Sequence, residues 1–144
     1  MYRNILVPLD GSSLAEKILP HVKEIARLTN ATITLLSVAF AHTSADRFHG
    51  ADTEIRKIEA KELAEKYLDS LKQLLIEEGF TVKNQVRYGH PTSEILDYSE
   101  RKEIDLVAMS THGRTGLGRL TMGSVAEGVL RHASKPILVI RANA

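Results

Sequence analysis

The 144-residue chain contains no cysteine. This absence excludes disulfide scaffolds, thiolate nucleophiles and metal sites built on cysteine. The six histidines are scattered along the chain without the paired spacing of zinc ligands. We therefore expect no structural zinc site.

Net charge and long apolar runs are scarce as well. Nineteen Lys and Arg residues face 18 Asp and Glu residues, for a formal net charge of +1. Such a chain has no bulk attraction for nucleic acid or an anionic membrane, so any anion site must be local. No apolar run approaches the roughly 20 residues that span a bilayer, and the start, "MYRNILVPLD", is too polar for a signal peptide. We expect a cytoplasmic protein without membrane insertion.

Familiar catalytic motifs are missing too. The chain has no "GxxxxGK[ST]" P-loop, no dinucleotide "GxGxxG" after its first apolar run and no "GxSxG" nucleophile elbow. Phosphoryl transfer needs a group that orients the nucleophile, and no general base is evident. These absences predict a protein that is not an enzyme, or is at most a weak ATPase.

The chain does contain a regular alternation of short β-branched apolar runs with longer stretches of helical period. This alternation is typical of a parallel sheet with helices on both faces. The length suits one domain with a single core, so we predict one Rossmann-like α/β domain over residues 1–144. The five predicted strands are Asn4–Leu9, Thr32–Val38, Thr81–Tyr88, Ile104–Ser110 and Pro136–Arg141.

Four helices are predicted between these strands. In "SLAE", Ser13 and Glu16 are spaced as a capping box for the first helix, and Pro20 either bends that helix or delays its regular start. The other three helices run from near Thr53 to a left-handed stop at Gly79, from Pro91, and from just after Gly123.

The segment Phe40–Asp52, "FAHTSADRFHGAD", has neither the strand nor the helix period. We predict a flexible loop there. Loops of this length are often lids or binding segments, and a simple surface excursion explains the segment equally well.

A glycine-rich stretch, "MSTHGRTGLGRLTMGS" over Met109–Ser124, follows the fourth predicted strand. Ligands of open parallel sheets bind beyond the carboxyl ends of the strands, where the strand order reverses. The order 3-2-1-4-5 places "PLDGS", after the first strand, opposite this stretch. The order 2-1-3-4-5 would instead line the crevice with "YGHP". We expect the first order, because it makes the two unusual loops meet.

Residue types in the glycine-rich stretch suit a phosphate. The helix after Gly123 presents backbone N–H groups and the positive end of its dipole. Gly113 and Gly116 allow close backbone approach to an anion, and Ser124 can donate its hydroxyl. Taken singly, each has a plainer explanation, since glycines make turns and Ser124 can be an N-cap. Together at this spacing they predict nucleotide binding.

The segments "ILVPLDGS" and "MSTHGRTGLGRLTMGSVAEGVLRHASKPILVI" resemble the universal stress protein family, and the resemblance covers nearly the whole chain. It implies a fold similar to the adenine nucleotide alpha hydrolases. In the nucleotide-binding branch the motif is Gly-x-x-Gly, nine residues, then Gly-Ser or Gly-Thr, and it holds the phosphates and ribose of ATP. Gly113, Gly123 and Ser124 match this motif, whereas Ser110 stands at its first glycine.

The resemblance implies ATP as the ligand, with ADP or AMP as alternatives and Mg²⁺ as a companion of the phosphates. Aliphatic side chains suit an adenine face, and Asp10 can accept from ribose hydroxyls or reach the Mg²⁺. A turn or helix-start cap is the alternative role for Asp10. The predicted nucleotide-binding residues are Pro8, Leu9, Asp10, Val38, Met109, Ser110, Gly113, Gly116, Gly123, Ser124 and Val125.

The last strand predicts a partner. A carboxyl-terminal strand at a sheet edge exposes backbone donors and acceptors that a second copy can pair. The resemblance implies a homodimer joined through this strand, although burial under the protomer's own helices explains its apolar run equally well. The candidate dimer residues are Ile137, Leu138, Val139 and Ile140.

The sequence therefore favours an ATP-binding regulatory protein of the stress response, which holds its nucleotide between the first and fourth strands and hydrolyses it slowly if at all. The alternative is a dimeric interaction module of the same fold that binds no nucleotide. The serine at position 110, in place of the motif glycine, favours this alternative. An adenylating or ATP-pyrophosphatase enzyme is disfavoured, because "PLDGSSLAE" lacks that group's serine- and glycine-rich first loop. Fold resemblance alone cannot assign the physiological role.

Overall fold

The computed structural model describes residues 1–39, 50–101, 103–112 and 122–142. Strands and helices alternate along the chain, as predicted, and a short 3₁₀ helix, η1, precedes the first α-helix. The elements are β1 (Asn4–Pro8), η1 (Ala15–Ile18), α1 (Leu19–Thr29), β2 (Thr32–Ala39), α2 (Gly50–Glu77), β3 (Thr81–Tyr88), α3 (Pro91–Ser99), β4 (Leu106–His112), α4 (Met122–His132) and β5 (Ile137–Ala142).

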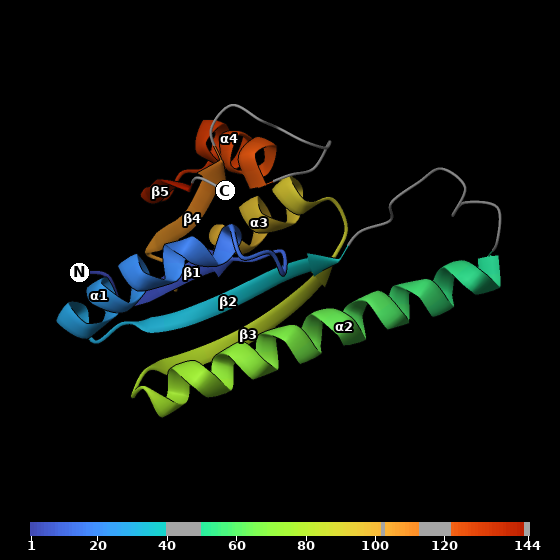
Figure 1. The fold of residues 1–144 in the computed structure, drawn as a ribbon. Coiled ribbons are helices and arrows are strands. Elements are labelled where there is room, and N and C mark those ends of the chain that lie inside the picture. The colour runs from blue at the N-terminus through green and yellow to red at the C-terminus, as the bar shows by residue number, and fades with distance from the viewer. Residues whose placement is uncertain (40–49, 102, 113–121, 143–144) are drawn as a thin grey trace.

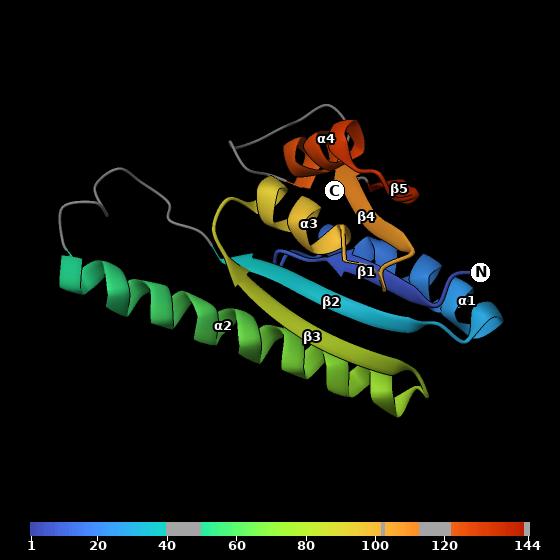
Figure 2. The same ribbon diagram turned by 180° about the vertical axis from the view of Figure 1, so that it is seen from behind.

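The five strands form one parallel sheet in the order β3-β2-β1-β4-β5. This order confirms the predicted 3-2-1-4-5 arrangement and excludes 2-1-3-4-5. Right-handed crossovers place α1 and α2 on one face of the sheet and α3 and α4 on the other. Figure 1 views the sheet from the side of α1 and α2, and Figure 2 from the side of α3 and α4.

The core lies in the middle of the sheet. The central strands β1, β2 and β4 have fully buried apolar side chains in succession, because helices cover both of their faces. This burial explains why their sequences are apolar without strict alternation. The side chains with 0% exposure on these strands include Ile5, Leu6, Val7, Ile33, Leu35, Leu36, Val107, Ala108 and Met109.

The start of α1 shows the role of Pro20 and differs from the predicted capping box. The regular helix begins at Leu19 with Pro20 in its first turn, so the proline delays the helix and does not bend it. The predicted capping box of Ser13 and Glu16 is wrong. Leu14 is the N-cap of η1 and makes no side-chain cap. The Ser12 hydroxyl accepts from the N–H of Ala15, and the Glu16 carboxylate accepts from the Tyr67 hydroxyl.

The remaining element ends lie close to their predicted positions. Gly79 has a φ of +98° after α2, as a left-handed stop requires, and α3 begins at Pro91. The fourth helix begins at Met122, one residue before Gly123. Residues 50–52 of the predicted loop belong to α2, whereas residues 40–49 lie outside the described residues. Within the described ranges, no helix has the length and apolar character to cross a bilayer.

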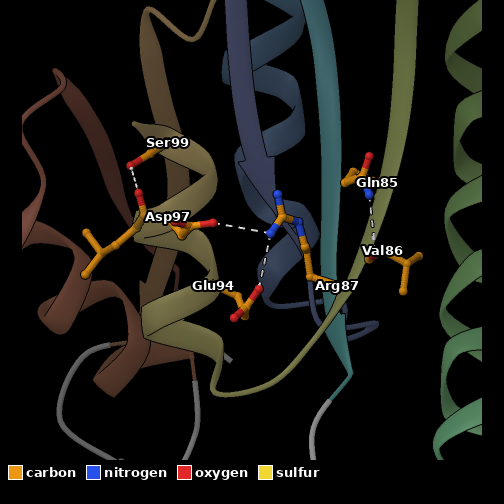
Figure 3. Close-up of polar contacts among 7 residues, drawn as sticks. Gln85, Val86, Arg87, Glu94, Asp97 and Ser99 are labelled. Carbon is orange, nitrogen blue, oxygen red and sulfur yellow. Dashed lines mark hydrogen bonds and ion pairs between the residues drawn. The ribbon is translucent and has the colours of Figure 1, made fainter. Parts of the chain in front are cut away.

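An ion-pair cluster connects β3 to α3. The guanidinium of Arg87 lies 3.5 Å from a carboxylate oxygen of Glu94 and 3.3 Å from one of Asp97, as Figure 3 shows. The same guanidinium lies over the ring of Tyr98, 5.2 Å from its centroid. Because Arg87 is near the carboxyl end of β3, these contacts hold α3 across the face of the sheet.

Candidate functional site

The strand order reverses between β1 and β4. Their pairing covers only two register positions, Ile5 with Leu106 and Leu6 with Val107. On its other side, β4 pairs with β5 at six positions and continues to His112. The pairing of β1 and β4 therefore stops before either strand ends. Such a switch point at the carboxyl edge is where open α/β sheets bind their ligands.

The connection after β1 begins as a hydrogen-bonded turn. Pro8 and Leu9 are buried, whereas Asp10 is exposed. Oδ1 of Asp10 accepts from the backbone N–H of Ser12 at 2.9 Å and from the Ser12 hydroxyl at 2.5 Å, and Gly11 has a φ of +88°. Asp10 therefore has the turn role that the sequence left as an alternative. These bonds use one of its two carboxylate oxygens.

The carboxyl half of β4 supplies Met109 and Ser110, which are both completely buried. The hydroxyl of Ser110 donates to the backbone carbonyl oxygen of Ala15 in η1, at 3.1 Å. The Ser110 side chain, at the position where the resemblance implies glycine, is therefore engaged inside the protein. On the neighbouring strand β2, Val38 is half-buried near the same edge.

The amino end of α4 also lies at the carboxyl edge, because the helix follows β4. Gly123, Ser124 and Val125 fall in its first turn, and they are half-buried, exposed and buried respectively. Gly113 and Gly116 lie outside the described residues. The structure thus brings the predicted residues of β1, β2, β4 and α4 to one edge of the sheet.

Tyr67 and Glu16 form a contact near this edge that the sequence analysis missed. The Tyr67 hydroxyl, on α2, donates to Oε2 of Glu16 in η1 at 2.6 Å. Burial, followed by the hydrogen bond and charge of Glu16 and the charge of Asp10, raises the pKa of Tyr67 far above its ordinary value. Tyr67 therefore remains a protonated donor.

The Asp10 turn was an alternative that the sequence offered, whereas the Tyr67–Glu16 bond was missed. "DGS" is a turn sequence in which an aspartate accepts from the backbone two residues later, so the Asp10 turn had a readable signal. The Tyr67–Glu16 bond joins residues 51 positions apart and had none. No group of three histidine or acidic side chains in the described ranges is arranged to hold a metal ion.

Comparisons with known proteins agree with this architecture. The model of the universal stress protein family matches residues 1–141. Universal stress protein MJ0531 of Methanocaldococcus jannaschii is 32% identical over 145 aligned residues, which cover 98% of this chain and 83% of that protein.

Solved structures share the fold. The structure of MJ0577, also from M. jannaschii, has a TM-score of 0.84 at 32% identity and covers 100% of this chain and 99% of its own. A universal stress protein family protein from Arabidopsis thaliana, solved with AMP bound, has a TM-score of 0.70 at 19% identity and covers 99% and 93%. The match over nearly its whole length shows that the chain belongs to the universal stress protein family.

Proposed function

We propose that this protein binds an adenine nucleotide, ATP in the first place, at the carboxyl edge between β1 and β4. It acts in the cytoplasm as a regulatory protein of the stress response. The observation that carries the proposal is that the Asp10 turn and the first turn of α4 both lie at the carboxyl edge, beside the strand-order switch point. The plant protein with AMP supports the ligand class, because it has the same fold.

In this proposal the phosphates lie against the first turn of α4, with Gly123 and Ser124. In this proposal Gly113, which matches the motif, and Gly116, which allows close backbone approach, also serve the phosphates. Asp10 is exposed and has a carboxylate oxygen outside its turn, which suits a ribose hydroxyl or a Mg²⁺ held by the phosphates. The same chemistry accepts ADP or AMP with fewer phosphate contacts.

The adenosine side of the site rests on aliphatic residues. Val38 is half-buried and leaves part of its surface exposed, whereas Pro8, Leu9 and Met109 are buried. Ser110 contributes through its backbone, because its hydroxyl is bonded to Ala15. The serine at the first glycine position therefore leaves the crevice open in this proposal, which weakens the case for a module that binds no nucleotide.

Calorimetric titration of ATP and AMP, with Mg²⁺, into protein stripped of carried-over nucleotide tests the proposal. We expect saturable ATP binding that Gly113→Val abolishes and that Asp10→Ala weakens about tenfold, or about 1.4 kcal/mol. Asp97→Ala is the matched control, because this exposed carboxylate lies on α3. Absence of both heat and carried-over nucleotide would favour the interaction module instead.

The proposed protein is a binder with at most slow hydrolysis. Among the described residues, the candidate site offers no evident general base beside the proposed phosphate position, and ordinary enzymes turn over at about 10 per second. We expect ATP hydrolysis by the purified protein to be far slower than this. Metal-dependent turnover at an ordinary enzymatic rate, lost in Ser124→Ala, would contradict this part of the proposal.

We also propose a homodimer formed through β5. This strand is at the edge of the sheet, and its residues 137–140 are all half-buried, whereas the neighbouring β4 is fully buried at Val107–Met109. A second copy would cover the remaining apolar surface and pair the edge. Sedimentation at micromolar concentration should show a dimer, and Val139→Lys should shift it to monomer. A wild-type monomer would refute the dimer. The candidate residues remain Ile137, Leu138, Val139 and Ile140.

A further inference from the structure

We infer that Ser110 and Tyr67 are positioning residues that clamp η1 from two sides and thereby hold the Asp10 turn in place for the nucleotide. The inference rests on the proposed function for its ligand. The clamp itself is defined by contacts within the fold, so the two can be tested separately.

From the side of β4, a chain of hydrogen bonds leads to Asp10. Both backbone polar groups of Ala15 have a side-chain partner: its N–H donates to the Ser12 hydroxyl oxygen, and its carbonyl accepts from the Ser110 hydroxyl, both at 3.1 Å. Ser12 in turn donates its N–H and its hydroxyl to Oδ1 of Asp10. Movement of Ala15 therefore disturbs the Asp10 turn.

Burial makes the Ser110 link effective. Ser110 and Ala15 both have 0% exposure, so water cannot replace the hydroxyl when it is removed. A buried hydrogen bond whose partner is lost leaves a group without compensation, which costs more than the bond contributed. Glycine, the family's residue at this position, has no hydroxyl and cannot make this link. The departure from the motif thus has a specific structural use in this chain.

From the side of α2, Tyr67 holds the next residue along η1. Its hydroxyl donates to the Glu16 carboxylate at 2.6 Å, a bond strengthened by the charge of the acceptor. Because Glu16 follows Ala15 directly, the two side chains fix adjacent residues of a helix of four residues. A turn ordered in advance binds its ligand with a smaller loss of conformational entropy.

Two variants test the clamp, Ser110→Ala and Tyr67→Phe. In Ser110→Ala we expect amide hydrogen exchange of residues 12–18 to rise about tenfold, while exchange in β2 changes little. The Kd for ATP should rise about fivefold in Ser110→Ala and about threefold in Tyr67→Phe. In the double variant the Kd should rise by less than the product of the two single rises, because both side chains hold η1.

Ser99→Ala is the matched control. Ser99 is also completely buried, and its hydroxyl donates to the carbonyl oxygen of Leu96 at 2.7 Å, at the end of α3 (Figure 3). Its loss should reduce global stability much as the loss of Ser110 does. Ser99→Ala should leave both the amide exchange of residues 12–18 and the ATP affinity unchanged, because Ser99 does not contact η1. A general loss of stability alone would therefore not change these two measurements.

The outcomes separate the clamp from the proposed function. Unchanged exchange of residues 12–18 in Ser110→Ala overturns the clamp, whether or not ATP binds. Raised exchange with unchanged ATP affinity overturns the positioning role. A wild-type protein that binds neither ATP nor AMP defeats the proposed function, and exchange alone then decides whether the clamp exists. If Ser110→Ala does not fold, Tyr67→Phe is judged by the same criteria.

Discussion

At the amino edge of the sheet, the side chain and backbone of Asp105 join the starts of β1 and β4, whereas the pairing of the same two strands stops before the carboxyl edge. Oδ2 of Asp105, just before β4, accepts from the backbone N–H groups of Arg3 and Asn4 at 2.6 and 2.8 Å. The N–H of Asp105 donates to the carbonyl of Asn4 at 3.0 Å. Three hydrogen bonds thus join two strands that separate at their other end.

The helix-to-strand connections at the amino edge are tied in the same way. Nζ of Lys135 donates to the carbonyl oxygens of Arg101 and Ile104 at 3.0 and 2.7 Å, and the Ser134 hydroxyl donates to the Glu100 carboxylate. At the carboxyl edge, by contrast, the connections carry the candidate nucleotide residues. We therefore expect substitutions at the amino edge to change stability and substitutions at the carboxyl edge to change nucleotide binding.

We expect the largest effect from Asp105→Ala. This change leaves the N–H groups of Arg3 and Asn4 without their charged acceptor, and it should lower the free energy of unfolding by about 2 kcal/mol. Urea denaturation measures the loss. Asp105→Asn should cost less, because an amide oxygen can take the place of Oδ2. The Kd for ATP should be unchanged in both variants. A higher Kd in either folded variant would contradict the separation of stability from binding.

A smaller effect is expected where α3 and α4 approach each other. A Cβ at Gly128 would lie 2.8 Å from Cγ2 of Thr92. Gly128→Ala should therefore destabilise the protein by about 1.5 kcal/mol, since the clash outweighs the better helix propensity of alanine. Because α4 carries Gly123 and Ser124, the same change should also weaken ATP binding.

A double-mutant cycle checks the cause of the Gly128 effect. Thr92→Ser removes the methyl group that the added Cβ would meet, so Gly128→Ala should cost much less in that background. Thermal unfolding of the four proteins gives the coupling. Equal costs in the two backgrounds would show that another contact is responsible.

The smallest effect should appear in the pH dependence of Tyr67. Its raised pKa means that the folded protein keeps a proton that the unfolded chain loses near pH 10. The stabilisation from Tyr67 is therefore fully present below pH 10 and is lost as pH rises above it. Tyr67→Phe should be about 1 kcal/mol less stable than wild type at pH 8, and the gap should narrow toward pH 11. A constant gap over this range would contradict the raised pKa.

Prediction from sequence succeeded where the signal is local or repeated. Strand Thr81–Tyr88 was predicted to the residue, and Gly79 and Pro91 mark helix ends as expected. It failed at Ser13 and Glu16, because a matching spacing does not reveal which polar group competes for the cap. Ser12 supplies the bond to Ala15, and Glu16 is taken by Tyr67.

The alternation of strands and helices, the family resemblance, and the residue types that suit a phosphate at one end of the sheet can all be read from the amino-acid sequence. These depend on periodicity, on turn-forming residues and on a motif within one segment. The bond from Ser110 to Ala15, 95 positions away, and the bond from Tyr67 to Glu16 became visible in the folded protein alone. The physical reason is that such bonds exist only after the strand order has brought distant segments together, and no local pattern encodes that distance.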